Sequence, residues 1–211
     1  MKLETFEAVF KKRINRFVGT VLLNQQLIEV YIPNTGSLKT VLFPESTVFL
    51  RKIFSKKFLY SLVIVLVDSS YVGVDTHIPN KLFQEFYSTK NIKKEIVIGS
   101  SRIDFLLEDT YVEVKNVTMK EKKTALFPDA VSLRARKHLE VLETLRLQHK
   151  KTVLFFCIQR SDVKFFSPSD IDLVYAARLK ELSLNLKIQA FVCHVSPSEI
   201  YIQKEIPVIF S

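Results

Sequence analysis

The sequence predicts an α+β protein in which a small OB-like β-barrel precedes a mixed sheet flanked by helices. Five closely spaced β-rich runs have no convincing helix between them, and their number fits a five-stranded OB-like barrel. After Asp75 the pattern changes to strands interspersed with helices, which is typical of a sheet covered on both faces. We therefore expect two domains, 1–75 and 76–211. The five runs span residues 16–23, 26–32, 47–53, 60–67 and 70–76.

Helices and strands are both expected in the second domain. Runs rich in β-branched and aromatic residues predict strands at 95–99, 102–107, 111–117, 152–158 and 187–195. Apolar residues three and four positions apart predict helices at 78–89, 129–147 and 172–185. In the longest helix, Asp129 is the expected N-cap. Its expected apolar stripe is Val131, Ala135, Leu139 and Leu142.

The composition favours a folded protein with a polyanionic partner. Of the 211 residues, 47% are hydrophobic, which excludes a disordered chain, and Lys plus Arg exceed Asp plus Glu by 31 to 22. Both halves are basic, which points first to nucleic acid, although a lysine-rich proteome would give the same excess. Cys157 and Cys193 lie in apolar runs and are expected to be buried thiols. Without a signal-peptide pattern or an apolar run of spanning length, we expect a cytoplasmic protein.

Two carboxylates occur in neighbouring predicted strands, in the segment "RIDFLLEDTYVEVKNV". If Glu108 and Asp109 form a two-residue loop, counting outward places Asp104 opposite Glu113, with Lys115 on the same face. The loop is a hypothesis, because such turns prefer glycine. The opposite face would carry Ile103, Phe105, Val112 and Val114.

Like charges opposite each other on a sheet repel, so this arrangement calls for compensation. Mg²⁺ commonly binds through one or two carboxylates together with substrate phosphate. Lys115 would point to the same place, so Asp104, Glu113 and Lys115 suit metal-dependent phosphodiester hydrolysis. The alternative is a salt-bridged surface face, in which Lys115 and Arg102 neutralise the two acids.

Other candidate contacts are individually weaker. Barrels of this type often bind nucleic acid through basic and aromatic side chains. For any single residue, however, the favoured interpretation is a core position for Phe17 and solvated surface for the basic residues. In "PNTGS" we expect a turn in which Asn34 and Gly36 adopt unusual backbone angles. His138 could contact phosphate or be solvated, and Gln159-Arg160 could lie near the site or at a surface strand end. The barrel candidates are Arg13, Arg16, Phe17, Lys39 and Lys52.

Several short blocks follow one another through nearly the whole chain: "NRFVG", "PNTGSL", "SSRIDFLL", "YVEVKNVT", "LFPDAV", "RKHL" and "FSPSDID". Together and in this order they resemble the sugar fermentation stimulation protein family, within the PD-(D/E)xK nuclease-like superfamily. The resemblance implies an OB-like domain, a restriction-endonuclease-like domain, DNA binding and a role in regulating sugar metabolism, notably maltose genes.

Matched position by position, the resemblance implies that Asp104 and Glu113 bind Mg²⁺ or Mn²⁺ and that Lys115 is the catalytic lysine. The carbonyl of Val114 would be a further metal ligand. Glu95 would complete the site, with Glu85 as its rival. The helix block departs from the family at Leu133 and Ala135 but keeps Arg134, Lys137 and His138.

Two functions therefore remain open. One is an Mg²⁺-dependent nuclease that binds DNA largely independently of base sequence. The other is a non-catalytic DNA-binding transcriptional regulator that uses the nuclease-like fold only for binding. Arg134 and Lys137 join the barrel residues as candidate DNA contacts.

Overall fold

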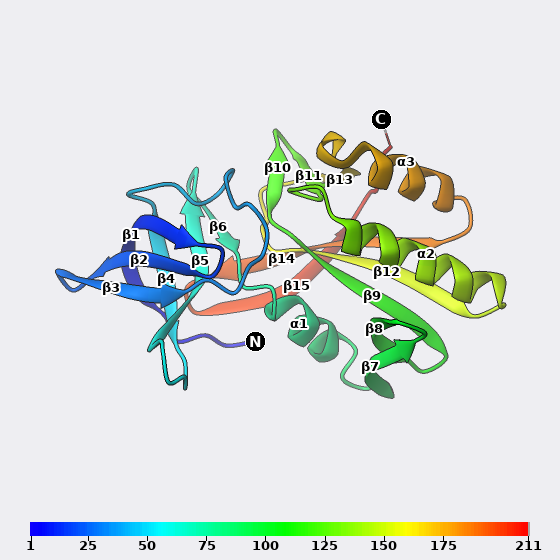
Figure 1. The fold of residues 1–211 in the computed structure, drawn as a ribbon, viewed down its shortest axis with the longest axis horizontal. Coiled ribbons are helices and arrows are strands. Elements are labelled where there is room, and N and C mark those ends of the chain that lie inside the picture. The colour runs from blue at the N-terminus through cyan, green and yellow to red at the C-terminus, as the bar shows by residue number, and fades with distance from the viewer. Residues whose placement is uncertain (211) are drawn as a thin grey trace.

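The computed structural model describes residues 1–210 and contains the predicted barrel. The first sheet has the strand order β3-β2-β1-β4-β5-β6, and a pairing of β3 with β5 at Tyr31 and Ser61 closes β1–β5 into a five-stranded barrel (Figure 1, left). Its strands are β1 (Phe6–Asn15), β2 (Val18–Leu23), β3 (Gln26–Tyr31), β4 (Thr47–Lys52), β5 (Tyr60–Val67) and β6 (Ser70–Gly73).

The predicted set of barrel strands lacked the first strand, β1, and wrongly included the last run. β1 was not predicted, because only Ala8 and Phe10 of its ten residues are buried and its second half is strongly basic. The run at 70–76, predicted as the fifth barrel strand, instead forms β6, which pairs with β5 alone. The fifth strand of the barrel is therefore the less apolar of the two segments, because β1 pairs with both β2 and β4.

The second sheet is mixed, as predicted. Its order is β15-β14-β12-β9-β8-β7, in which β9, β12 and β14 are parallel and the other pairings antiparallel. The strands are β7 (Ile92–Ile98), β8 (Ser101–Leu107), β9 (Thr110–Val117), β12 (Lys151–Ile158), β14 (Lys187–Ser196) and β15 (Glu199–Ile206). Strand β15 was not predicted, nor was a small sheet of β10 (Met119–Glu121), β11 (Thr124–Phe127) and β13 (Phe165–Pro168).

Helices cover both faces of this sheet (Figure 1). α2 (Leu133–Leu147) and α3 (Leu173–Leu182), preceded by the short η1 (Asp170–Asp172), pack on one face, and α1 (Ile78–Phe86) packs on the other. Ser132, not Asp129, caps α2 by accepting the Ala135 N–H at 3.1 Å. Val131 precedes the helix and is exposed, so it is not part of the apolar stripe.

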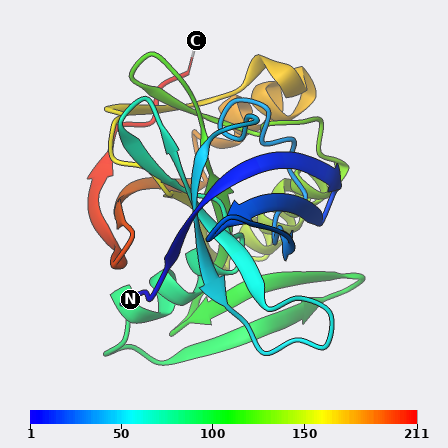
Figure 2. The same cartoon turned by 90° about the vertical axis from the view of Figure 1, so that its left-hand side faces the viewer.

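The two domains are in close contact. Figure 2 views the molecule from the barrel side, with the second domain behind. Barrel residues Phe49, Val63 and Ile64 share a buried cluster with α1 and the second sheet. The first residues of the chain also belong with that sheet, since the Leu3 N–H donates to Ser198 O at 2.8 Å.

Two further expectations can be compared with the fold. Cys157 and Cys193 are buried free thiols, as predicted, with their sulfurs 3.5 Å apart on neighbouring strands. Within residues 1–210, no helix has the length and apolar character needed to cross a membrane.

Candidate metal and nucleic-acid site

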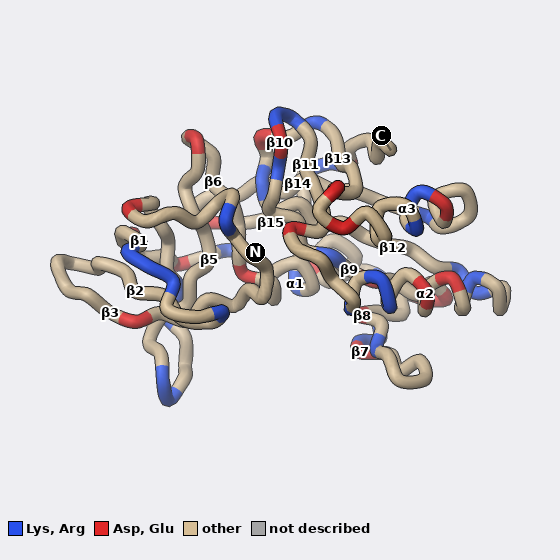
Figure 3. Tube along the Cα trace, turned by 45° about the horizontal axis from the view of Figure 1, so that its top comes forward, with Lys and Arg blue, Asp and Glu red and all other residues tan. Residues whose placement is uncertain are grey.

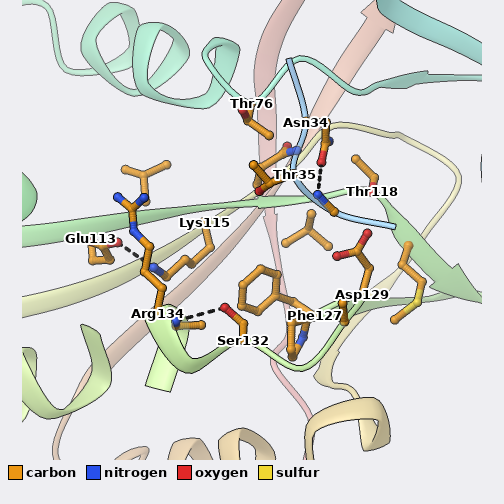
Figure 4. A pocket seen from close by; sticks show the side chains of 18 of the residues that line it. Asn34, Thr35, Thr76, Glu113, Lys115, Thr118, Phe127, Asp129, Ser132 and Arg134 are labelled. Carbon is orange, nitrogen blue, oxygen red and sulfur yellow. Dashed lines mark hydrogen bonds and ion pairs between the residues drawn. The ribbon is translucent and has the colours of Figure 1, made fainter. Parts of the chain in front are cut away.

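A cleft of about 720 Å³ lies where the barrel meets the second domain. Four segments form most of its lining: the barrel loop around 34–36, the start of α1, the β8–β9 hairpin, and the stretch from Leu126 to Ala135 that leads into α2. Figure 4 shows Glu113 and Lys115 on one side of this cleft, and Asn34, Asp129 and Phe127 on the other. The acids predicted from the sequence therefore lie in the interdomain cleft.

The hairpin that carries the acids has the predicted register from the turn as far as Phe105, but the predicted pair of Asp104 and Glu113 does not form. Phe105 pairs with Val112 and Leu107 with Thr110 across a two-residue loop, in which Glu108 takes the positive φ of 55° that glycine would otherwise supply. The pairing of β8 with β9 ends at Phe105. There the Asp104 carboxylate accepts the backbone N–H of Val114 at 2.8 Å.

The end of this pairing changes which way β8 faces. Ile103 packs in the cluster with α2 and α3, whereas Phe105, Val112 and Val114 pack in the cluster with α1. The expectation that Ile103 shares their face was wrong, because strict alternation does not continue past the point where β8 leaves β9. Asp104, between the two orientations, receives a second hydrogen bond of 3.1 Å from the side chain of Asn80 on α1.

Glu113 lies at the centre of a buried polar cluster. Its Oε1 accepts a hydrogen bond of 2.6 Å from Lys115 Nζ and also contacts Nδ1 of His138, which comes from α2. Lys115 Nζ lies 3.0 Å from the same His138 nitrogen. All three side chains are buried, and Arg102 pairs with Glu95 instead. The predicted alternative was therefore right that Lys115 neutralises Glu113, and wrong in placing this pair on the surface and in the role of Arg102.

The two acids have opposite electrostatic environments. Burial raises the pKa of Asp104, and the nearby charge of Glu113 raises it further. Burial also acts to raise the pKa of Glu113, but Lys115 and His138 outweigh it, so this pKa lies below its usual value. The repulsion expected between the carboxylates is therefore concentrated on Asp104.

The donor set of this site suits a hard divalent cation. Oε2 of Glu113 is buried and has no hydrogen-bond partner within the described part of the chain, so this oxygen is available to coordinate a cation. Carboxylate oxygens are the ligands that Mg²⁺ and Mn²⁺ prefer. The number of protein ligands at this site is small, because residues 1–210 contain no group of three or more His, Cys, Asp or Glu side chains arranged to hold a metal.

The two rival third ligands lie in different places. Glu95 lines the cleft, although it is exposed and its carboxylate pairs with Arg102 at 2.9 Å. Glu85 is not among the cleft-lining residues and pairs with the amino terminus at 2.8 Å. Glu95 is therefore the better placed of the two. The Val114 carbonyl stays a predicted ligand, with Val114 lining the cleft.

The predicted DNA contacts do not all lie at the cleft. Arg16 and Arg134 are exposed and line the cleft from its two sides. Exposed Lys39 and Lys52 lie outside the lining, and Lys137 donates to Ser100 Oγ at 3.1 Å. Figure 3 shows that such basic segments occur on both domains.

Arg13 has a structural position instead. Its guanidinium donates to four backbone carbonyls, at 2.7 to 3.1 Å, and so holds the barrel loop that lines the cleft. This use of its N–H groups makes it a poor phosphate ligand. The four carbonyls belong to Arg16, Asn34, Gly36 and Ser37.

The barrel loop meets Asp129 at close range, which the sequence did not reveal. Neither Asn34 nor Gly36 has the positive φ that was predicted, and Leu38 has it instead, at 53°. Gly36 is needed for space, since a Cβ there would lie 2.5 Å from Oδ2 of Asp129. The same Asp129 oxygen accepts the Leu38 N–H at 3.4 Å, which explains why Asp129 is not the helix cap.

The burial of three polar residues near the cleft was not predicted from the sequence. Gln159 and Arg160 are fully buried, so the surface reading was wrong. Gln159 donates to Asn116 Oδ1 at 2.7 Å and to Asp75 O at 3.1 Å, and thereby joins the sheet to the domain junction. The signal for His138 was its place in the buried stripe, between Ala135 and Leu142 at helical spacing.

Comparisons with known proteins cover nearly the whole chain. The family description "SfsA N-terminal OB domain" matches residues 12–74, and "Sugar fermentation stimulation protein RE domain" matches residues 73–199. Both sets of residues are consistent with the observed barrel and mixed sheet. The predicted boundary at residue 75 itself stays a prediction.

Individual relatives are similar over nearly their full lengths. A sugar fermentation stimulation protein homolog of Aquifex aeolicus is 36% identical over 200 residues, with 92% of each chain covered. One of Pelobacter propionicus is 38% identical over 218 residues, with 94% of each covered. Among solved structures, Pyrococcus furiosus SfsA in complex with Ca²⁺ matches with a TM-score of 0.92 and 28% identity, covering 99% of both chains.

Proposed function

The chain belongs to the sugar fermentation stimulation protein family, and from this premise we propose that it is a DNA-binding protein with a divalent-metal-dependent phosphodiesterase site. The observation that carries the proposal is the arrangement of Asp104, Glu113 and Lys115 in one cleft between the domains. Two acids and a lysine beside a basic surface suit the charges of a phosphodiester and its metal ion.

Support for the metal comes from two sources. Asp104 and the unpartnered Oε2 of Glu113 offer carboxylate oxygens in a buried setting. A relative similar over 99% of this chain is described as a complex with Ca²⁺, another oxygen-seeking divalent cation. Bound Mg²⁺ or Mn²⁺ would supply Lewis-acid polarisation of a phosphate oxygen and an acidified water.

The side chains of the protein would do the remaining work. Asn80 and the Val114 N–H hold the Asp104 carboxylate in place. Lys115 has three N–H donors, of which contacts with Glu113 and His138 engage at most two. The third is available for a water nucleophile or a phosphate oxygen, where a fixed positive charge stabilises the transition state.

DNA binding is supported by charge on both sides of the cleft. Arg16 projects from the barrel side and Arg134 from the helix side. The chain carries a net charge of +9, with basic residues in both domains. Contacts of this kind neutralise phosphates and carry little base-sequence information.

The deciding experiment compares cleavage by wild type, Asp104→Asn and Glu113→Gln. Plasmid and single-stranded DNA are incubated with Mg²⁺, Mn²⁺ or chelator, and nicked and linear products are separated. Asp109→Asn is a matched control, because Asp109 is an exposed acid in the same hairpin. We expect wild type and the control to cleave DNA only when metal is present. Both site variants should lose this cleavage.

The second candidate is a non-catalytic DNA-binding regulator. One observation favours it: along residues 1–210 no third acidic, His or Cys side chain joins Asp104 and Glu113 in a metal-binding group. In that case wild type would bind DNA, and no metal would produce cleavage on any DNA form. The paired acids would then serve as a metal clamp or a buried structural cluster.

A further inference from the structure

The barrel carries a row of aromatic rings that the cleft chemistry does not use. Phe17, in the turn after β1, stacks near Tyr31 at the end of β3, with ring centroids 6.4 Å apart and planes inclined by 27°. Tyr31 stacks in turn near Phe58, in the loop between β4 and β5, at 6.1 Å and 25°. Three nearly parallel rings from separate segments thus form one row across the barrel surface.

These rings are accessible and not core residues. Phe17 is 41% exposed, and Tyr31 and Phe58 are partly exposed. A continuous apolar row on a surface is a sign of a binding site, unlike single exposed apolar residues. The expectation that Phe17 would be a core residue therefore does not hold.

Positive charge accompanies the row at both ends. Lys57 Nζ lies 5.2 Å from the Phe58 ring centroid, and exposed Lys56 precedes it in the same loop. Figure 3 shows the tip of this loop between β4 and β5 as a basic segment. At the other end, Arg16 adjoins Phe17 and lines the cleft that holds Asp104 and Glu113.

We propose that the Phe17–Tyr31–Phe58 row binds single-stranded nucleic acid by stacking its bases and leads the strand past Arg16 into the cleft. Flat rings can stack on the faces of unpaired bases, and a duplex buries those faces within its own stack. Lysine and arginine beside the rings match the phosphates of the same strand. The inference rests on the proposed function only in taking the polymer to be nucleic acid.

Stacking also predicts sequence tolerance. Every base has a π-face, and each base stacked on an aromatic ring contributes enough that removing the ring weakens binding about 5- to 150-fold. The ring matters, so Tyr31→Phe should bind like wild type, and Phe17→Leu should lose affinity although it keeps an apolar side chain. This contrast separates base stacking from a site for an apolar protein segment.

The experiment measures fluorescence anisotropy of labelled oligo(dT) and oligo(rU), about 12 nucleotides long, and of a duplex of equal length. Chelator is present throughout, so that cleavage and metal play no part. The proteins are full-length wild type, Phe17→Ala, Phe17→Leu, Tyr31→Ala, Tyr31→Phe and Phe58→Ala. Tyr201→Ala is the matched control, because Tyr201 is also 41% exposed and stacks on His194 in the other domain.

The expected result is a loss of about 5- to 150-fold in single-strand affinity for Phe17→Ala, Phe17→Leu, Tyr31→Ala and Phe58→Ala. Duplex affinity should change little in these variants, and Tyr31→Phe and Tyr201→Ala should match wild type. Equal single-strand binding by all variants would overturn the proposal that the aromatic row binds bases, and would leave the proposed DNA binding intact. Failure of wild type to bind any of the three probes would overturn both proposals. Circular dichroism melts check that each variant is folded.

Discussion

The backbone N–H of Val114 donates to Oδ2 of Asp104 at 2.8 Å, at the point where β8 and β9 cease to pair. This contact holds the Asp104 carboxylate close to Glu113, although the two residues do not pair in the β-ladder. It also leaves the charge of Asp104 only partly compensated, since its pKa is raised by burial and by Glu113. The first two predictions follow from this uncompensated charge.

Divalent metal should stabilise wild type and not Asp104→Asn. Binding to the folded state alone adds about 2.7 kcal/mol to the free energy of unfolding when the metal is at about 100 times its Kd. Thermal melts with Mg²⁺, Mn²⁺ or chelator measure this gain. Asp109→Asn, changed in the exposed turn of the same hairpin, should respond like wild type. Equal gains in wild type and Asp104→Asn would show that metal does not bind through Asp104.

Without metal, Asp104 should make stability fall as pH rises. A carboxyl group whose pKa is raised by folding contributes stability below its unfolded pKa, near about 4, and loses it as pH passes through the folded value. Asp104→Asn removes this loss and retains an acceptor for the Val114 N–H. Urea unfolding in chelator between about pH 4 and 7 should show the variant gaining on wild type with rising pH. A constant difference across that range would contradict the raised pKa.

Lys115→Ala should affect both stability and cleavage. The side chain is buried against Glu113, so its removal leaves an underpaired carboxylate and should cost about 3 kcal/mol. If the protein is a nuclease, the cleavage rate should fall about 10²–10³-fold, with DNA affinity nearly unchanged. Lys150→Ala, exposed just after α2 and outside the cleft lining, is the control and should retain the cleavage rate. Normal cleavage by a folded Lys115→Ala protein would exclude the catalytic role.

DNA affinity should fall steeply with salt, because each neutralised phosphate releases condensed counterions. Arg16→Ala and Arg134→Ala should each reduce the slope of log K against log salt by about 1 on a random duplex. Arg13→Ala should instead lower the melting temperature, because its guanidinium holds the 34–37 loop. Affinity measured at several salt concentrations separates these roles, and a flat salt response in wild type would contradict them.

Gly36→Ala should destabilise the domain junction by about 1–3 kcal/mol. The new Cβ would meet the Asp129 carboxylate at 2.5 Å and displace it from the Leu38 N–H. Adding Asp129→Ala should relieve the contacts with Asp129 and leave only the one of 2.9 Å to Asn34 Oδ1, so the double variant should lose less than the sum of the two single losses. A double-mutant cycle by urea unfolding measures this coupling. Additive losses would show that the two residues do not constrain each other.

Local sequence patterns were sufficient to predict the strand pairing next to the turn of the β8–β9 hairpin. Alternation and a two-residue loop gave the pairing of Phe105 with Val112, because register in a tight hairpin depends only on counting from the turn. The same counting failed at Ile103, where pairing ends and the strand turns toward α2. Similarly, β1 was not predicted because its place in the barrel comes from pairing with β2 and β4, not from its own apolar content.

The sequence by itself determined the two-domain α+β plan, the buried free cysteines and the local hairpin that carries Asp104, Glu113 and Lys115. These features depend on composition, periodicity and short-range register. Only the tertiary structure placed His138 against Glu113, Asn80 against Asp104, and Gly36 against Asp129. The partners in these pairs are 24 to 93 residues apart in the chain, so the docking of helices and barrel onto the sheet brings them together, and no local pattern encodes those distances.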